Sequence, residues 1–333
     1  MLVVFARSLL FQAASQAFTT RFFMLLFSFR RSLLTVALLL ACCFSVSARE
    51  PVQVTIPATP DGTIKAVVTG FGEGKFEVLW QALPASYQAD IKKLIVEFSK
   101  KMDADLWAQG NKVAGKVTKL FTDKADFIIG NQIVAQQLQA KAVKPEDAKL
   151  YITGIGGILT DIQTGTATLP DVEKLDVEKL LANIGPKFRE LNEVSARMGI
   201  LPPGTNINDV FKIDAKLISS ASDAATLEVT QADGSKKTQE FVRVEGKWVP
   251  KEMADQWASK IGEAQKAIQG LEIKPEDKQQ AIMITGMASG MLDGFLNAKT
   301  QQEFDASIAA LLPLISGALP KPAQPQAPPS FQN

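Results

Sequence analysis

Two aspartates are the residues of this chain whose type and spacing could support chemistry. Asp161 and Asp293 each follow a glycine, Gly154 or Gly286, by seven residues, so each acid lies on the same side of its predicted helix as that glycine. If a duplication brought the two helices together around a pseudo-twofold axis, the paired carboxylates could bind a cation or do acid–base work. The simpler alternative is two aspartates that are solvated or hydrogen-bonded locally.

Glycine-rich phrases in the same two segments raise the question of a phosphate site. A dinucleotide-binding fingerprint needs G-x-G-x-x-G directly after a strand. The phrase Gly154-Ile-Gly156-Gly157 has Leu159 where the last glycine belongs, and it lies within a helix that the preceding residues 144–147 (KPED) have already begun. A phosphate-binding loop is therefore excluded at this position.

The glycines instead predict close packing of helices. Gly286, Gly290 and Gly294 are four residues apart and form a ridge without side chains; in the first segment Gly154, which corresponds to Gly286, and Gly157 are expected to have the same role. Each glycine in a helix interior costs about 0.5–1 kcal/mol relative to alanine. We expect a compensating contact, which is tight helix packing inside the fold, self-association or membrane insertion, or a ligand lying against bare backbone.

Three phrases occur twice, in the same order, along the chain. The matched segments are 104–108 with 254–258, 144–147 with 274–277, and 152–154 with 284–286. We interpret them as a duplicated three-helix unit that covers residues 101–198 and 251–319. The alternative is that helix caps and alanine-rich helices converge on similar phrases.

The spacing of apolar residues predicts an α+β fold that is mainly helical. A helical period of 3.6 holds before and after residues 210–250, where the period changes to two and Asp233-Gly234 and Glu245-Gly246 supply turns. That central stretch predicts an antiparallel β-meander of three to four strands between the duplicated three-helix units. The expected organisation is a signal peptide (1–48), an extended N-terminal segment (49–75), a helical region with the first repeat (76–200), the β-meander (210–250), the second helical repeat (251–319) and a Pro-rich disordered tail (320–333).

The first 48 residues contain four arginines and no Asp, Glu or Lys. From Met24 onward, a basic segment precedes an apolar stretch and then Val46-Ser47-Ala48, which is the pattern that a signal peptidase cuts. We expect translation to start at Met24 and cleavage between Ala48 and Arg49. The alternatives are a lipoprotein modified at Cys42, or an organelle transit peptide or retained anchor.

Composition excludes several kinds of chemistry. The 333 residues contain no histidine, and both cysteines, Cys42 and Cys43, lie in the signal, so the processed chain lacks thiolate nucleophiles, imidazole bases, disulfides and zinc sites built on those ligands. With 36 basic and 35 acidic residues, the chain is close to neutral, and its net charge does not favour binding to nucleic acid. After the signal, the longest strongly apolar stretch, 308–319, contains Pro313 and is shorter than the ~20 residues of a membrane span. We expect no cofactor, no nucleic-acid partner and no transmembrane span after processing.

The hairpin sequence ATLEVTQADGSKKTQEFVRVEGKWVP, residues 225–250, resembles the terminal hairpin of small exported bacterial proteins with nuclear-transport-factor-like or lumazine-binding-like cone folds. The resemblance covers this stretch alone and implies a fold that encloses a pocket. The signal, the phrase ALPASYQADIKKLIVEF and the Pro-rich tail resemble exported envelope proteins of Gram-negative-type bacteria of unknown function. That resemblance implies an envelope location and carries over no functional residue.

These observations lead to one main hypothesis and two others. The main hypothesis is a non-catalytic exported envelope protein, periplasmic or secreted, that acts as a protein-interaction or scaffold module with another envelope protein as its partner; homo-oligomer formation stays open. The second is a periplasmic small-ligand-binding protein with an apolar pocket between sheet and helices. The third is a carboxylate-dependent hydrolase.

Overall fold

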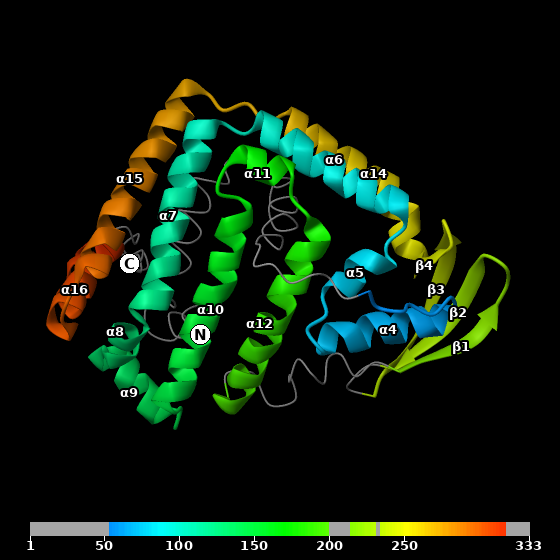
Figure 1. The fold of residues 1–333 in the computed structure, drawn as a ribbon, viewed down its shortest axis with the longest axis horizontal. Coiled ribbons are helices and arrows are strands. Elements are labelled where there is room, and N and C mark those ends of the chain that lie inside the picture. The colour runs from blue at the N-terminus through cyan, green and yellow to red at the C-terminus, as the bar shows by residue number, and fades with distance from the viewer. Residues whose placement is uncertain (1–52, 200–213, 231–233, 318–333) are drawn as a thin grey trace, which may run out of the picture.

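The computed structural model describes residues 53–199, 214–230 and 234–317, with side chains as far as residue 310 in the last helix (Figure 1). The fold is mainly helical with one small antiparallel sheet, as predicted. The helices are α4 (Pro60–Gly72), α5 (Glu77–Ala82), α6 (Ala85–Lys101), α7 (Ala104–Asp123), α8 (Ala125–Gly130), α9 (Gln132–Ala140), α10 (Pro145–Gly165), α11 (Leu169–Glu173), α12 (Val177–Arg197), α14 (Lys251–Gln269), α15 (Pro275–Asn297) and α16 (Gln301–Gly317). The strands are β1 (Asp214–Ser220), β2 (Ala224–Thr230), β3 (Lys236–Val244) and β4 (Lys247–Pro250).

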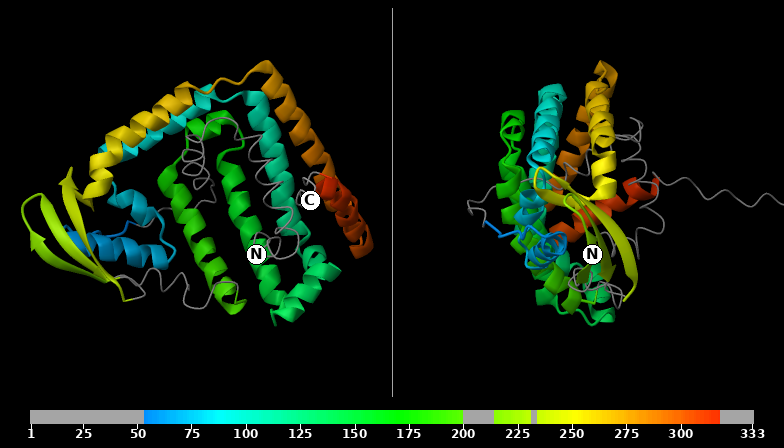
Figure 2. Two further views of the ribbon diagram at one scale, coloured as in Figure 1. Left: turned by 180° about the vertical axis from the view of Figure 1, so that it is seen from behind. Right: turned by 90° about the vertical axis from the view of Figure 1, so that its right-hand side faces the viewer.

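Two long helical segments run side by side in the same direction. The helix α14 lies along α6, and α15 lies along α7, as both faces of the molecule show (Figures 1 and 2). Polar contacts join residues about the same distance apart in sequence: Lys278 Nζ bonds to Asp103 at a separation of 175 residues, and Gln301 Nε2 bonds to the Phe127 carbonyl at a separation of 174. The two segments are therefore aligned in register from the sheet end of the molecule to α16.

The helix α7 also contacts α10, and α10 contacts α12, so these helices form a row beside α15 (Figure 1). Small clusters of buried apolar side chains hold the elements together. One cluster joins α5, α6, α11 and α12 around Trp80, Ile95 and Leu180. Another joins α8, α10, α15 and α16 around Ile128, Phe295 and Phe304. The core is thus distributed along the molecule.

The sheet has the predicted meander topology, with the strands in the order β1-β2-β3-β4. The loop between β3 and β4 consists of Glu245 and Gly246, whose φ angles of 50° and 79° are those of a type I′ turn. Gly234 has a φ of 79°, and Asp233 lies outside the described residues. One face of the sheet is apolar and packs against Ile64 of α4.

The prediction of an extended N-terminal segment over residues 49–75 is wrong for residues 60–72, which form α4. Thr59 caps this helix by accepting a hydrogen bond from the Gly62 N–H, and Pro60 fits its first turn. The Val, Thr and Pro content that favoured an extended chain is outweighed by this start signal and by burial against the sheet. Trp248 of β4 secures the junction by donating its indole N–H to the Ala58 carbonyl at 2.7 Å.

The two proposed repeats share their helix starts but not their packing. Pro145 and Pro275 each open a helix at its first residue, as the repeated phrase predicts. The helix α7 packs against α10, whereas its proposed counterpart α14 packs mainly against α6 and the sheet. Trp107 donates its indole N–H to the Thr166 carbonyl, and Trp257, at the matching position, donates to Asp90 and stacks on a tyrosine.

Candidate functional site

The helix α15 lacks, along its middle, the charged side that an outer helix of a globular protein usually carries. Between Lys278 and Asp293 it contains no charged residue, and its main neighbours are α7 along one side and α16 near its end. A helix that is apolar all round is normally buried on all sides. The position of α15 at the outside of the molecule therefore leaves apolar surface uncovered.

The side of α15 that faces α7 is held by a polar cluster. Lys116 Nζ donates to the Ser289 carbonyl (3.1 Å), the Ser289 Oγ (2.7 Å) and the Asp293 carboxylate (2.6 Å). The lysine side chain is only 16% exposed, and its three N–H donors are directed at three oxygens. The serine–lysine pair thus serves as a clamp between two helices, and the ammonium has no donor left over for a substrate.

The other candidate aspartate has an equivalent role in a different interface. Asp161 of α10 is 5% exposed and forms an ion pair with Lys187 of α12, which also donates to the Gly157 carbonyl. Asp161 and Asp293 therefore each bind a lysine from a neighbouring helix, and the two carboxylates do not form the pair that a duplication could have produced. Within residues 53–199, 214–230 and 234–317, no three His, Cys, Asp or Glu side chains gather closely enough to hold a metal ion.

The glycines of the first segment lie in tight helix contacts, as predicted for Gly154. A methyl group added there would lie 2.9 Å from Leu191 of α12, and one added at Gly156 would lie 2.8 Å from Thr122 of α7. At Gly157 the nearest atom, in Lys187, is 3.8 Å away, which is ordinary contact. The predicted ridge included Gly157 but not Gly156, which has the closer neighbour.

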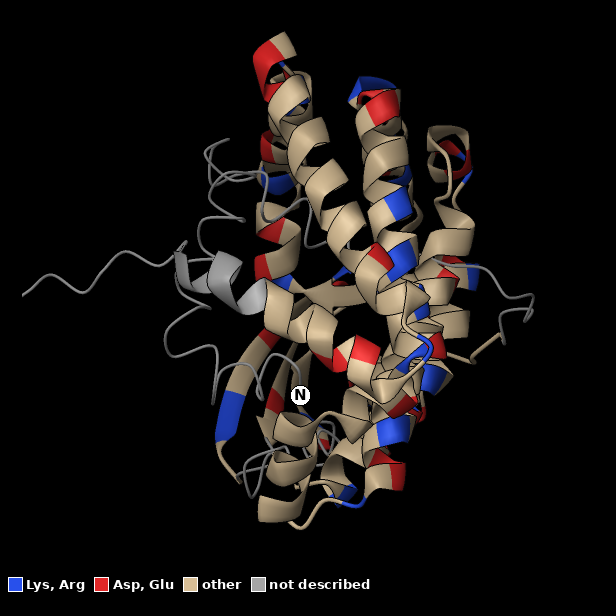
Figure 3. Ribbon diagram, turned by 90° about the vertical axis from the view of Figure 1, so that its left-hand side faces the viewer, with Lys and Arg blue, Asp and Glu red and all other residues tan. Residues whose placement is uncertain are grey.

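The predicted packing ridge of the second segment is wrong for two of its three glycines. A methyl group added at Gly286 or Gly290 meets no described atom within 4 Å, and at Gly294 it meets only Ser307 of α16, at 3.3 Å. Met283 and Met287 lie on the same face of α15 and are 59% and 55% exposed. We call these five residues, Met283, Gly286, Met287, Gly290 and Gly294, the Met–Gly face. In Figure 3, which looks toward α15 and α16, no charged residue interrupts the middle of α15.

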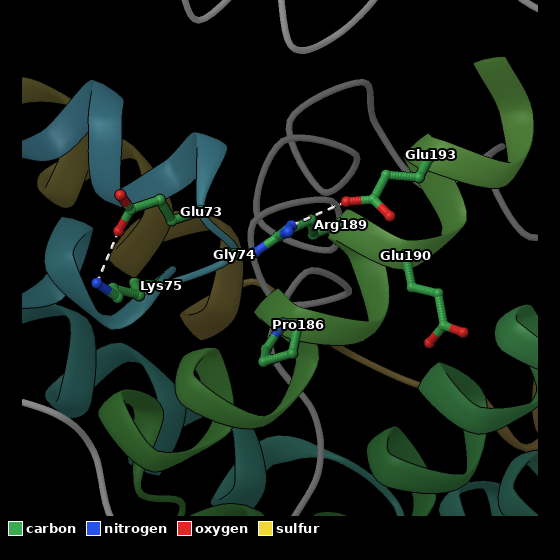
Figure 4. A pocket seen from close by; sticks show the side chains of 7 residues that line it. All are labelled: Glu73, Gly74, Lys75, Pro186, Arg189, Glu190 and Glu193. Atoms are coloured by element: carbon green, nitrogen blue, oxygen red, sulfur yellow. Dashed lines mark hydrogen bonds and ion pairs between the residues drawn. The ribbon is translucent and has the colours of Figure 1, made fainter.

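A separate cavity of about 550 Å³ lies where the turn after α4 meets α12. Figure 4 shows its side chains: Lys75 pairs with Glu73, Arg189 pairs with Glu193, and Glu190 points away from both pairs. The lining residues are Glu73, Gly74, Lys75, Pro186, Arg189, Glu190 and Glu193. This cavity is polar and lies away from the sheet, so it is not the apolar pocket between sheet and helices that the ligand-binding hypothesis predicts.

No known protein family, curated protein or solved structure matches this chain.

The signal residues Ala48 and Arg49 and the alternative lipidation site Cys42 lie outside the described residues. Among the helices of the described ranges, none has both the length and the apolar character that a membrane span requires. The glycine spacing predicted the ridge that forms part of the Met–Gly face, but not that the face is exposed. The missing signal was the pair of methionines one helical turn apart: Met283 precedes the glycines, Met287 lies between Gly286 and Gly290, and both share the face of the glycines.

Proposed function

We propose that this chain is a non-catalytic exported envelope protein whose helices present a docking surface to a protein partner, either another envelope protein or a further copy of the chain. The observation that carries the proposal is the Met–Gly face of α15, which combines two methionines more than half exposed with two glycines, Gly286 and Gly290, that no described element contacts. Methionine side chains are flexible and adapt to a partner surface. An exposed apolar strip with a polar surround is typical of a protein-binding site.

The polar clusters support an interaction role over catalysis. Both aspartates that could have served as acid or base are used in helix-to-helix ion pairs, and the buried hydroxyl of Ser289 bonds to a lysine that is already saturated. The charged cavity favours no small ligand, because its lysine and arginine are each paired with a glutamate. Binding through an apolar helix face is what remains on the described surface.

The proposal is tested in cells of the source organism with a photoreactive amino acid placed at Met287. We expect one discrete protein adduct from this position, its loss when Gly290→Lys is added, and no adduct from a photoreactive residue at Gly262 of α14, where a side chain also has open space. The same adducts from both positions, or none from Met287, would refute an interaction surface on α15. Mass spectrometry of the recovered chain also tests export: a start at Arg49 excludes lipidation, and a diacylated Cys42 excludes free secretion.

A further inference from the structure

We propose that the occupant of the Met–Gly face is a second copy of the same chain, bound through its own α15 in the antiparallel direction. The inference rests on the proposed function, since it names the partner of that surface. Its starting point is the lack of any internal reason for two of the glycines. Gly286 and Gly290 each lower helix stability by about 0.5–1 kcal/mol relative to alanine, and nothing described in the chain packs into the space they leave. A helix packed closely against them from outside would supply the compensating contact.

The pattern of the face matches itself. When two α15 helices run antiparallel about a twofold axis between residues 286 and 287, Met283 of one copy lies opposite Gly290 of the other, as a knob faces a hole. The two copies of Met287 then meet beside the axis on one edge of the contact, and the two copies of Gly286 meet on the other edge, where the lack of a side chain lets the backbones approach closely. The twofold axis repeats the Met283–Gly290 pairing, so one self-matching strip makes a closed dimer.

The charges around the face favour the same partner. An isologous contact brings identical surfaces together, so any charge in its centre would meet a like charge. Residues 279–292 contain none. The opposed helix dipoles are also favourable in the antiparallel direction.

The size of the surface sets the expected strength. The uncharged stretch of fourteen residues is about 21 Å long, and a single helix pair of this length buries less than the ~1,200–2,000 Å² of a standard stable interface. We therefore expect a weak dimer that dissociates at concentrations on the order of 10 µM.

The test combines sedimentation velocity with cysteine crosslinking of the full chain, in a background where Cys42 and Cys43 are replaced by serine. From about 1 to 100 µM, the wild-type chain is expected to shift from monomer to dimer. Gly290→Lys is expected to stay monomeric and folded, because its side chain enters open space in the monomer but carries a like charge into the contact. Gly262→Lys on α14 is the matched control, with the same charge change and the same open space, and is expected to dimerise normally.

Crosslinking tests the antiparallel direction. Under copper phenanthroline oxidation, Met287→Cys is expected to form a disulfide between copies, because position 287 lies next to the axis. Met283→Cys is expected to fail, because the two copies of position 283 are about 10 Å apart along the helices, beyond disulfide reach. Equal crosslinking at both positions would indicate a parallel pair and overturn the inference.

Two further outcomes would overturn the inference without refuting the proposed function. One is a wild-type chain that stays monomeric at all concentrations while Met287 still yields a discrete adduct to a different protein. The other is a dimer that persists in Gly290→Lys. Binding to vesicles of anionic and zwitterionic lipid that Gly290→Lys abolishes, with no dimer at any concentration, would assign the face to a membrane surface and overturn both.

Discussion

Gly185 of α12 provides the sharpest test of the packing described above. It lies against the turn that follows α4, where the carbonyl carbon of Gly74 would be 2.8 Å, and the Phe76 nitrogen 3.1 Å, from a methyl group added at Gly185. Both neighbours are backbone atoms and cannot turn aside as a flexible side chain would. Gly74 also has a φ of 75°, a conformation that glycine adopts without strain, so the turn has little freedom to move.

We predict that Gly185→Ala lowers the free energy of unfolding by about 2 kcal/mol. Rigid backbone neighbours place the overpacking cost at the upper end of its usual ~1–3 kcal/mol, and the gain in helix propensity offsets about 1 kcal/mol of it. Gly262→Ala on α14 is the control, because a methyl group there meets no described atom within 4 Å, and it is expected to raise the free energy of unfolding by about 0.5–1 kcal/mol. Urea unfolding followed by far-UV circular dichroism measures both. Equal stability of Gly185→Ala and the wild-type chain would refute the close approach of α12 to the α4 turn.

Two further predictions concern charged pairs. Lys187→Met leaves the buried Asp161 carboxylate without its partner and is expected to lower the free energy of unfolding by about 3 kcal/mol. Lys236→Met breaks an exposed pair on the sheet and is expected to lower it by less than about 1 kcal/mol. Similar losses for the two variants in urea unfolding would contradict the burial of Asp161. The hydrogen bond from Lys278 holds the pKa of Asp103 below its usual value in the folded protein. The ionised carboxylate therefore stabilises the fold at pH values above its unfolded pKa of about 3.9, and this stabilisation is lost as the pH falls through the lower folded pKa. Asp103→Asn keeps an N-cap acceptor but not the charge, so its urea midpoint is expected to fall less than the wild-type midpoint between neutral and acid pH; equal falls would show that Asp103 is not a stabilising carboxylate.

Local signals in the sequence predicted the elements of the fold well. Thr168 and Asp171, three residues apart, form a capping box at the start of α11, and Pro145 and Pro275 open the helices that the repeated phrase implies. The Glu245-Gly246 turn and the alternating pattern around it form the meander. These signals act within a few residues, so the amino-acid types alone are sufficient to read them.

The partners of each helix could not be predicted in the same way. An apolar stripe indicates that one face of a helix is covered, but not which element covers it. In the absence of that information, the repeat predicted that α14 would pack as α7 does. The stack of Tyr87 on Trp257, with ring centroids 3.8 Å apart, places α14 on α6 instead. For the same reason the partners of the two aspartates could not be predicted. The spacing indicated on which side of its helix each aspartate lies, but the lysines that bind them are 26 and 177 residues away in sequence.

The in-register alignment of α6 and α7 with α14 and α15 has a consequence for how the chain acquires its structure. When α7 leaves the ribosome, the residues that will cover its outer side, some 174 positions later, have not yet been made. Contacts between such distant residues slow folding, because a long loop must close before they form. In a nascent chain, the sides of α6 and α7 that α14 and α15 cover therefore stay exposed until synthesis is nearly complete. A product that ends before residue 251 would leave these sides uncovered and would tend to aggregate.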